Sequence, residues 1–396
     1  MKTIAVFFGG HSAEHDVSIV TALATVIKPL ELTKKYQVEA VYIAKDGTWY
    51  WDNQLKDITW FTRGTIDRYM SRAHNPPASV EFTKGGGMVL QRPKPFGGQQ
   101  RQKIDVAFPA MHGTYGEDGA LMGLLDMAGV PYAGCGMAAG VLAMDKVLAK
   151  QVAQANGILT PAFRYYSRAA VERDVSAIAA DAAKALSFPL FVKPAHLGSS
   201  IGISMVKNVT ELRNGLEVAA RYDETIIVEE GVQNLIEVTL PVIGNDDLTP
   251  AFLEQPLVSA DDFFDFETKY MGQGGKGGKK GGAKQSGKQG AQGYSQIPAP
   301  LDDKLYAQAE ATGLAVYKAL GCSGMARVDM LIDSKSKKVY FNEVNPLPGS
   351  LYAHNWRQKG ISNVALVTRM VELGEARFAE RQKLDTVFST NFLKQF

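Results

Sequence analysis

The feature that most constrains the fold is a pair of apolar segments near the carboxyl end, 324–333 and 339–349, in which polar side chains recur at alternate positions. Such alternation predicts strands, because side chains two positions apart on a strand point to the same face. The polar residues that share a face in this way are Arg327 and Asp329 on the first segment, and Glu343 and Asn345 on the second. Two adjacent strands would bring these four side chains together.

This combination favours metal and phosphate chemistry. Carboxylate and amide oxygens are hard ligands that suit Mg²⁺ carrying phosphates, and an arginine beside them can stabilise developing negative charge. An ordinary hairpin with a solvated polar face is the alternative. It explains Asp333 and the lysine-rich turn, but not an arginine and three oxygen ligands inside apolar strands.

Composition predicts a globular protein of two or three domains, since the chain has 396 residues with 45% hydrophobic and 21% charged side chains. Residues 271–293 hold five lysines and no acid. Removing these five charges from the net charge of +2 leaves −3, which argues against a nucleic-acid-binding protein.

Neither an export signal nor a membrane span is expected. The apolar run Ile4–Phe8 ends too early for a signal peptide, and 128–144 contains Pro131 and four glycines. Cys135 and Cys322 are too few for a disulfide framework. We therefore expect a cytoplasmic protein.

Apolar periodicity predicts an α/β chain that begins with βαβ units in residues 1–125. The expected strands are Ile4–Phe8, Val38–Ala44, Ile104–Phe108, Pro189–Pro194, Thr225–Glu230 and Glu237–Val242, and the expected helices are Val17–Ile27, 138–156, 171–185 and 361–381.

Residues 272–293 form a glycine- and lysine-rich segment that has no apolar side chain beyond alanine. Such a segment cannot bury a core, so we expect a mobile loop. It is either an insertion beside an active site, which we favour, or a weak polyanion-binding patch.

Two glycine-rich turns are candidates for ligand binding. The turn 196–202 follows a strand that ends at Lys193 and could fold over phosphates through backbone N–H groups. The turn 112–119 carries an acid that could hold a small zwitterion. Each turn alone is weak evidence, because both kinds are common.

Taken in order, these motifs resemble the ATP-grasp superfamily and, within it, the D-alanine–D-alanine ligases. The resemblance covers nearly the whole chain and implies an α/β (α+β), three-domain ATP-grasp architecture with an amino-terminal doubly wound βαβ domain. We expect domains at 1–125 (substrate binding), 126–215 (central) and 216–396 (catalytic, with the insertion at 272–293).

The resemblance also implies roles for particular residues. Glu14 would orient the first amino acid's ammonium with Ser199 and Tyr270, while Arg327 and the Gly349 N–H would stabilise the oxyanion. The implied ATP-binding residues are Lys146, Lys193, Gly198, Ser200, Glu229, Glu230 and Lys269, and the implied ligands of two Mg²⁺ or Mn²⁺ ions are Asp329, Glu343 and Asn345. The turn 112–119 resembles the family's second signature, which implies that His112 and Glu117 belong to the substrate site.

The chain departs from the family's pattern at two binding positions. The usual ribose-binding glutamate is replaced by Ile236, which leaves Glu237 as the nearest acid. The run whose later serine binds the acceptor's carboxylate is replaced by Pro348–Trp356. Here Ser350, a backbone N–H or a protonated His354 could take that role.

The expected reaction joins two small amino acids, with D-alanine as the default, through an acyl phosphate made from ATP. It serves peptidoglycan precursor synthesis. The alternatives are another amino acid or a hydroxy acid as acceptor, another ATP-grasp activity, and a non-catalytic polyanion-binding protein. We expect neither a nucleic acid nor a membrane as partner, and a homodimer is an open possibility.

Overall fold

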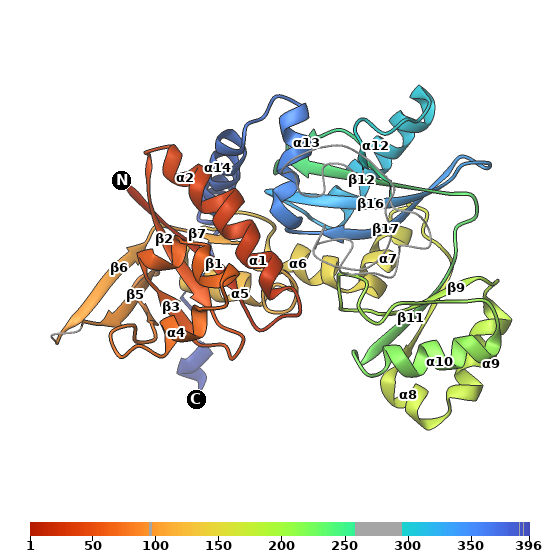
Figure 1. Cartoon of the computed structure of the whole chain (residues 1–396), viewed down its shortest axis with the longest axis horizontal. Coiled ribbons are helices and arrows are strands. Elements are labelled where there is room, and N and C mark those ends of the chain that lie inside the picture. The colour runs from red at the N-terminus through yellow and green to blue at the C-terminus, as the bar shows by residue number, and fades with distance from the viewer. Residues whose placement is uncertain (95–96, 258–294, 388, 391) are drawn as a thin grey trace, which may run out of the picture.

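The computed structural model describes residues 1–94, 97–257, 295–387, 389–390 and 392–396. The glycine- and lysine-rich segment at 272–293, together with Lys269 and Tyr270, lies outside these residues. Figure 1 shows an amino-terminal unit joined through α6 and α7 to two further sheets, one formed around β12, β16 and β17 and the other around β9 and β11.

The amino-terminal sheet is mostly parallel and has the strand order β3-β2-β1-β7. Strand β1 pairs in parallel with β2 and β7. Its alternate residues enter two different cores: Val6 packs with the helices on one face and Phe7 with α5 on the other. Burial on both faces explains the unbroken apolar run in β1. The elements are β1 (Lys2–Gly9), α1 (His15–Val20), the π-helix η1 (Thr21–Ile27), α2 (Lys28–Leu32), β2 (Tyr36–Ile43), β3 (Trp49–Trp51), η2 (Asn53–Lys56), α3 (Thr59–Thr62), α4 (Ile66–Met70), β7 (Val106–Pro109) and α5 (Ala120–Ala128).

A small antiparallel sheet, β4-β5-β6, flanks this unit. Its strands are β4 (Ser79–Phe82), β5 (Met88–Pro93) and β6 (Gln99–Ile104). The prediction of one strand at Ile104–Phe108 was therefore wrong. Ile104 ends β6 and Val106 begins β7, so one residue separates strands of two different sheets.

The predicted helix over 138–156 is two helices, α6 (Met137–Met144) and α7 (Lys146–Ala155). The break is at Asp145, whose φ of −97° and ψ of 102° are non-helical. The carboxylate of Asp145 accepts hydrogen bonds from the backbone N–H groups of Val147 and Leu148 and so caps α7. Because of this break, Lys146 is the first residue of α7.

The central sheet is antiparallel, in the order β10-β9-β11-β8, and its core faces three helices. Strands β8 and β11 lie on either side of residue 215 in the sequence, so the sheet spans that expected boundary. The domain division itself stays a prediction. The elements are β8 (Phe163–Ser167), α8 (Arg168–Arg173), α9 (Val175–Ala185), β9 (Leu190–Pro194), β10 (Ser204–Val206), α10 (Val209–Ala219) and β11 (Thr225–Glu230).

The carboxyl-terminal sheet has the order β13-β12-β16-β17 and packs its apolar face against α12. The predicted alternation is confirmed, because Val328, Met330 and Val344 are buried in this core. The elements are β12 (Leu235–Ile243), β13 (Thr249–Pro250), β14 (Gln255–Pro256), β15 (Ser295–Gln296), α12 (Asp303–Ala319), β16 (Met325–Asp333), β17 (Lys338–Asn345), η4 (Gly349–Tyr352), α13 (Ala353–Gln358), α14 (Asn363–Arg381) and η5 (Phe392–Gln395).

Among the described residues, no helix is both long enough and apolar enough to cross a membrane.

Candidate active site

The polar face of β16 and β17 brings the four predicted side chains together. The antiparallel register places Arg327 opposite Asn345 and Asp329 opposite Glu343. Arg327 forms a two-pronged ion pair with Asp329: Nε donates to Oδ1 at 2.6 Å and Nη2 donates to Oδ2 at 2.5 Å. The Asn345 amide lies 3.5 Å from the same Oδ2. The sequence prediction of a shared face is confirmed.

Glu343 is paired with a cation from another element. Lys146, the first residue of α7, places Nζ 3.5 Å from Glu343 Oε2. The same Nζ donates a hydrogen bond of 2.6 Å to the carbonyl of Leu197 in the turn after β9. Lys146 therefore connects the strand that carries the candidate ligands to the candidate phosphate-binding turn.

The donors fit a hard divalent cation that also binds phosphate. Within the described ranges, no three His, Cys, Asp or Glu side chains are grouped as a metal site. The candidate set is therefore Asp329 and Glu343, directly opposite each other, with the Asn345 amide beside them. A set this small leaves coordination positions for phosphate oxygens and water, as Mg²⁺ usually requires.

A largely buried Lys–Glu–Lys triad lies beside this face. The Glu229 carboxylate contacts Lys150 Nζ at 3.1 Å and Lys193 Nζ at 2.6 Å. Lys150 also donates to the carbonyl of Asn342 on β17, 2.9 Å away. Burial raises the pKa of Glu229, but the two ammonium groups outweigh burial and hold that pKa at about 2. Glu229 is therefore ionised. Burial lowers the pKa of Lys150, whereas attraction to Glu229 keeps the pKa of Lys193 raised, so Lys193 is the cation suited to an anionic ligand.

Sequence reasoning missed Lys150. It lies four residues after Lys146 on the same helix, so both lysines are on one face of α7. That spacing was the available signal. Nothing local in the sequence, however, indicates that Lys150 is fully buried.

Glu229 and Glu230 point to opposite sides of β11. Only Glu229 reaches the lysines, while Glu230 Oε1 accepts a hydrogen bond of 2.7 Å from the Ser187 N–H. Glu237 lies opposite Leu331 at the other end of β12 from the turn into β13 and is partly buried. Glu229 therefore belongs to the triad, whereas Glu230 ends β11 and Glu237 lies near the start of β12.

The turn from Gly198 to Gly202 reaches the amino-terminal unit. Ser199 Oγ donates a hydrogen bond to the Glu14 carboxylate. A Cβ added to Gly198 would lie 3.1 Å from Glu14 Oε1, so a larger residue there would force the Glu14 carboxylate to shift. Ser199 and Ser200 have left-handed φ angles of 53° and 59°. Burial raises the pKa of Glu14. The predicted association of Glu14 with Ser199 is present.

A second buried acid lies next to Glu14. Glu117 accepts hydrogen bonds from the N–H groups of Gly113 at 2.6 Å and Leu347 at 3.2 Å. Burial, followed by repulsion from Glu14, raises the pKa of Glu117 well above its usual value. Burial and the Arg327 charge lower the pKa of His112 to about 4, so this imidazole is neutral near pH 7.

The loop after β17 joins this buried cluster. Thr21 Oγ1 lies 2.9 Å from His112 Nε2 and accepts a 3.0 Å hydrogen bond from the Ser350 N–H. Ser350, Leu351 and Tyr352 have left-handed φ angles of 48°, 53° and 49°. Such strain occurs often at functional sites.

His354 is already paired with a carboxylate. Its Nε2 lies 3.0 and 2.9 Å from the two oxygens of the buried Glu254. The Arg327 guanidinium lies over the Tyr352 ring, 4.9 Å from its centre. Gly349 begins the short helix η4, which follows β17 and its residue Asn345 and leads to Tyr352. Ser350 and His354 thus have different surroundings.

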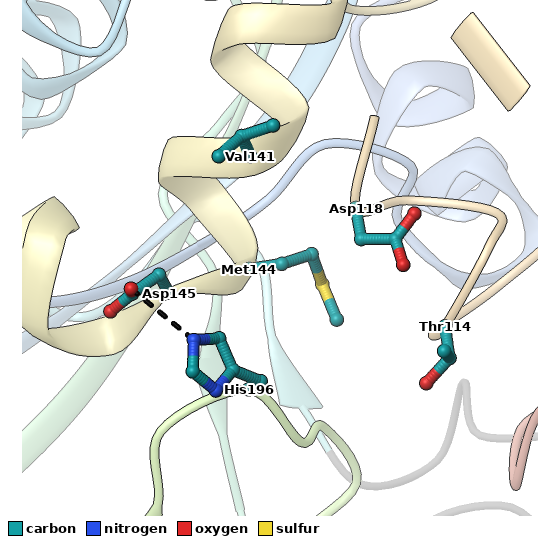
Figure 2. A pocket seen from close by; sticks show the side chains of 6 residues that line it. All are labelled: Thr114, Asp118, Val141, Met144, Asp145 and His196. Carbon is teal, nitrogen blue, oxygen red and sulfur yellow. Dashed lines mark hydrogen bonds and ion pairs between the residues drawn. The ribbon is translucent and has the colours of Figure 1, made fainter. Parts of the chain in front are cut away.

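A pocket of about 240 Å³ opens between the amino-terminal unit, α6 and the turn after β9. Figure 2 shows Thr114 and Asp118 on one side and Asp145 and His196 on the other. Apolar Val141 and Met144 complete the lining.

Two family models match the chain. The model described as D-ala D-ala ligase N-terminus matches residues 3–135, and the model described as D-ala D-ala ligase C-terminus matches residues 152–372. Together they span most of the chain.

Individual proteins of known name match over almost their full length. The D-alanine–D-alanine ligase of Acetivibrio thermocellus is 33% identical over 390 residues, covering 96% of this chain and 98% of the relative. That of Chlorobaculum parvum is 35% identical over 393 residues, covering 97% and 99%.

Solved structures show the same fold. The D-alanine–D-alanine ligase of Coxiella burnetii superposes with a TM-score of 0.74 at 27% identity, covering 96% of both chains. The VanG D-Ala:D-Ser ligase of Enterococcus faecalis gives 0.73 at 30% identity, covering 94% of this chain and 99% of that one.

Proposed function

This chain belongs to the D-alanine–D-alanine ligase family, and we propose that it couples ATP cleavage to the joining of two D-alanine molecules for peptidoglycan precursors. Its fold is the ATP-grasp architecture with an amino-terminal domain. One observation carries the assignment of the site: the ion pairs Arg327–Asp329 and Lys146–Glu343 lie on the polar face of β16 and β17. The buried Lys193–Glu229 pair of the central sheet lies close enough for Glu343 to raise the pKa of Lys193.

Two lysines and a turn bind the ATP phosphates in this proposal. Lys193 has a net raised pKa, because attraction to Glu229 outweighs the opposing effect of burial, so it remains a cation. Lys146 supplies a second charge. Backbone N–H groups of Gly198 and Ser200 in the turn cover the phosphates. Lys269, which lies outside the described residues, completes this set. Glu230 and Glu237 are the proposed contacts of the adenosine.

Members of this family need a divalent metal, and we assign two Mg²⁺ or Mn²⁺ ions to Asp329, Glu343 and Asn345. When bound, the metal neutralises phosphate charge and holds the reacting groups in line. The protein's part is to hold Asp329 through Arg327 and Glu343 through Lys146.

In the first step, the carboxylate of the first D-alanine attacks the γ-phosphorus of ATP, and ADP leaves. Glu14 binds the ammonium of this substrate. Because burial disfavours the charged form of Glu14, an ammonium partner is especially favourable there. Ser199 orients Glu14, Tyr270 is proposed to assist, and His112 and Glu117 shape the surrounding pocket. The product is D-alanyl phosphate.

In the second step, the amine of the second D-alanine attacks the acyl carbon. The amine loses a proton, the carbonyl oxygen becomes an oxyanion, and phosphate leaves as the carbonyl re-forms. Arg327 and the Gly349 N–H stabilise the oxyanion, a contact worth about 3–4 kcal/mol per donor in other enzymes.

A second candidate keeps this chemistry with another acceptor. The acceptor-binding run is changed, and Ser350–Tyr352 takes an unusual left-handed course beside His354. A D-amino acid with a larger side chain, such as D-serine, is the foremost alternative, followed by a D-hydroxy acid. We place the reaction in the cytoplasm, where ATP is made, and propose a homodimer as the working assembly.

The experiment is ADP release, with product mass, measured over a panel of single and paired D-amino and D-hydroxy acids. The proposal expects D-alanine alone to support turnover and to yield the dipeptide. Turnover only with D-alanine plus D-serine, or plus a D-hydroxy acid, would favour the second candidate.

A further inference from the structure

We propose that His196 is a positioning residue that fixes the phosphate-covering turn, residues 197–202, against the first turn of α7. This inference rests on the proposed function, because it concerns the turn and the lysine assigned there to ATP. His196 itself contacts no substrate in this account. It acts through Asp145 and Lys146.

His196 links two elements that are far apart in the sequence. Its Nδ1 lies 2.9 Å from Asp223 Oδ1, and its backbone N–H donates to Asp223 Oδ2 at 2.6 Å. Its Nε2 lies 3.3 Å from Asp145 Oδ2, the contact drawn in Figure 2. Asp223 precedes β11, whereas Asp145 separates α6 from α7. The imidazole therefore spans from the central sheet to the α6–α7 junction.

The charge on this imidazole suits the role. Hydrogen bonds to Asp145 and then to Asp223 raise the pKa of His196 to about 10. The ring is thus a cation between two carboxylates near neutral pH. Among the described residues, no other titratable side chain forms a hydrogen bond or ion pair with the ring.

His196 contacts the α6–α7 junction, and this junction also determines the position of Lys146. Asp145 uses Oδ1 to cap α7 and Oδ2 to meet His196. The Lys146 N–H donates to the Ala195 carbonyl at 3.1 Å, and its Nζ donates to the Leu197 carbonyl at 2.6 Å. Residues on both sides of His196 are therefore bonded to Lys146, and the side chain of His196 forms the third connection.

The consequence extends to the other end of the turn. Two residues after Leu197, Ser199 donates to Glu14 in the amino-terminal unit. A loosened turn would move the backbone N–H groups proposed to cover the phosphates, together with Lys146. The His196 side chain is 46% exposed and lines the pocket in Figure 2, so replacing it leaves no buried void.

Amide side chains can separate the two contacts. The amide nitrogen of Asn lies near the position of histidine Nδ1, and that of Gln near Nε2. His196→Asn therefore keeps a donor for Asp223 and loses the contact with Asp145, whereas His196→Gln keeps a donor for Asp145. Asp145→Asn removes the charge from the pair while retaining a residue that caps helices well. His74→Asn, at an exposed histidine of the amino-terminal unit, is the matched control.

Two readouts are needed: the affinity for Mg·ADP by calorimetry, and KM and kcat from ADP release. His196→Asn and Asp145→Asn should each weaken Mg·ADP binding and raise the KM for ATP about five- to tenfold, the usual scale for one partly exposed charged contact. His196→Gln and His74→Asn should stay within about twofold of wild type, and kcat should change less than KM.

Several outcomes would overturn the inference. These are wild-type affinity in His196→Asn, equal defects in His196→Asn and His196→Gln, or a lowered melting temperature with unchanged nucleotide affinity. The losses of Mg·ADP affinity in His196→Asn and Asp145→Asn should also be non-additive when the two substitutions are combined, since both break the same contact. If wild type binds Mg·ADP but releases no ADP with any amino acid, the proposed ligase function fails while the calorimetric comparison still tests His196.

Discussion

Asp329 and Glu343 lie directly opposite each other on β16 and β17, and each is neutralised by a different cation. Arg327 holds Asp329, and Lys146 holds Glu343. The polar face is therefore charge-balanced without a ligand. In the proposed site, Asp329 and Glu343 would supply oxygen ligands to a bound divalent cation, and Arg327 and Lys146 would then be available to the phosphates.

Removing one ligand charge tests this arrangement. We expect Glu343→Gln to reduce ADP release by at least about 100-fold, because it removes a ligand charge with little change in volume. Asp333→Asn, at the far end of β16, is the control and should retain activity. The melting temperature of both variants should equal that of wild type. Near-normal turnover in Glu343→Gln would contradict the assignment of the metal site.

Lys150 should be important for stability as well as for ATP binding. Lys150→Met leaves one oxygen of the buried Glu229 unpaired, and breaking a buried pair in this way usually costs about 3–5 kcal/mol in the free energy of unfolding. Adding Glu229→Gln should recover part of this loss, since the uncompensated charge is then absent.

Lys184→Met, at an exposed lysine of α9, is the comparison for that experiment. Chemical denaturation measures all the variants. If Lys150→Met were as stable as Lys184→Met, the triad would not be the stabilising unit that its burial indicates.

The neutral His112 predicts a pH dependence. Its folded pKa of about 4 lies below the usual value of 6.5, so the unfolded chain binds more protons between these values. Stability should therefore be lost as pH falls from about 6.5 to about 4, by up to about 3 kcal/mol for this group.

His112→Gln cannot titrate and should show a flatter decline than wild type over that range. Subtracting the two curves of unfolding free energy against pH isolates the histidine, because Glu117 is common to both. His74→Gln controls for losing a histidine. Parallel curves for wild type and His112→Gln would mean that His112 is not held neutral by the fold.

Two variants can show whether Ser350 or His354 binds the carboxylate of the acceptor. Ser350 has its backbone fixed by Thr21, whereas His354 is paired with Glu254. We expect Ser350→Ala to raise the KM of the second D-alanine roughly tenfold or more, the scale of a lost hydrogen bond to a charged group, with little effect on the first.

His354→Ala should act differently, because it removes one hydrogen-bond partner of the buried Glu254 and leaves the Asn355 amide near that carboxylate. We expect a lower melting temperature and a smaller change in acceptor KM than in Ser350→Ala. The opposite order of the two KM values would assign the acceptor's carboxylate to His354 instead.

The strands could be predicted because their patterns are local. Alternation in β16 and β17 identified the shared face of Arg327 and Asp329, and the continuous apolar run Ile4–Phe8 identified β1. The interruption at Asp145 could not be predicted in the same way. An aspartate between two helical segments is compatible with a helix interior, and only its non-helical backbone and its capping contacts define the break.

The residues of the site could be predicted only where the signal is local in the sequence. The lysine at 193 was identified because it ends a predicted strand before a glycine-rich turn. Lys150 depends on Glu229 and on the carbonyl of Asn342, which are distant in sequence, so its burial is a property of the assembled sheets. The pairing of His354 with Glu254 likewise joins residues a hundred positions apart.

The most direct test of the account is ADP release by the purified full chain with ATP, Mg²⁺ and D-alanine, followed by mass measurement of the product. We expect ADP to form only when both the metal and D-alanine are present, and D-alanyl-D-alanine to accumulate in equal amount. ADP release that is independent of any amino acid, or the absence of dipeptide while ADP forms with D-alanine, would contradict it.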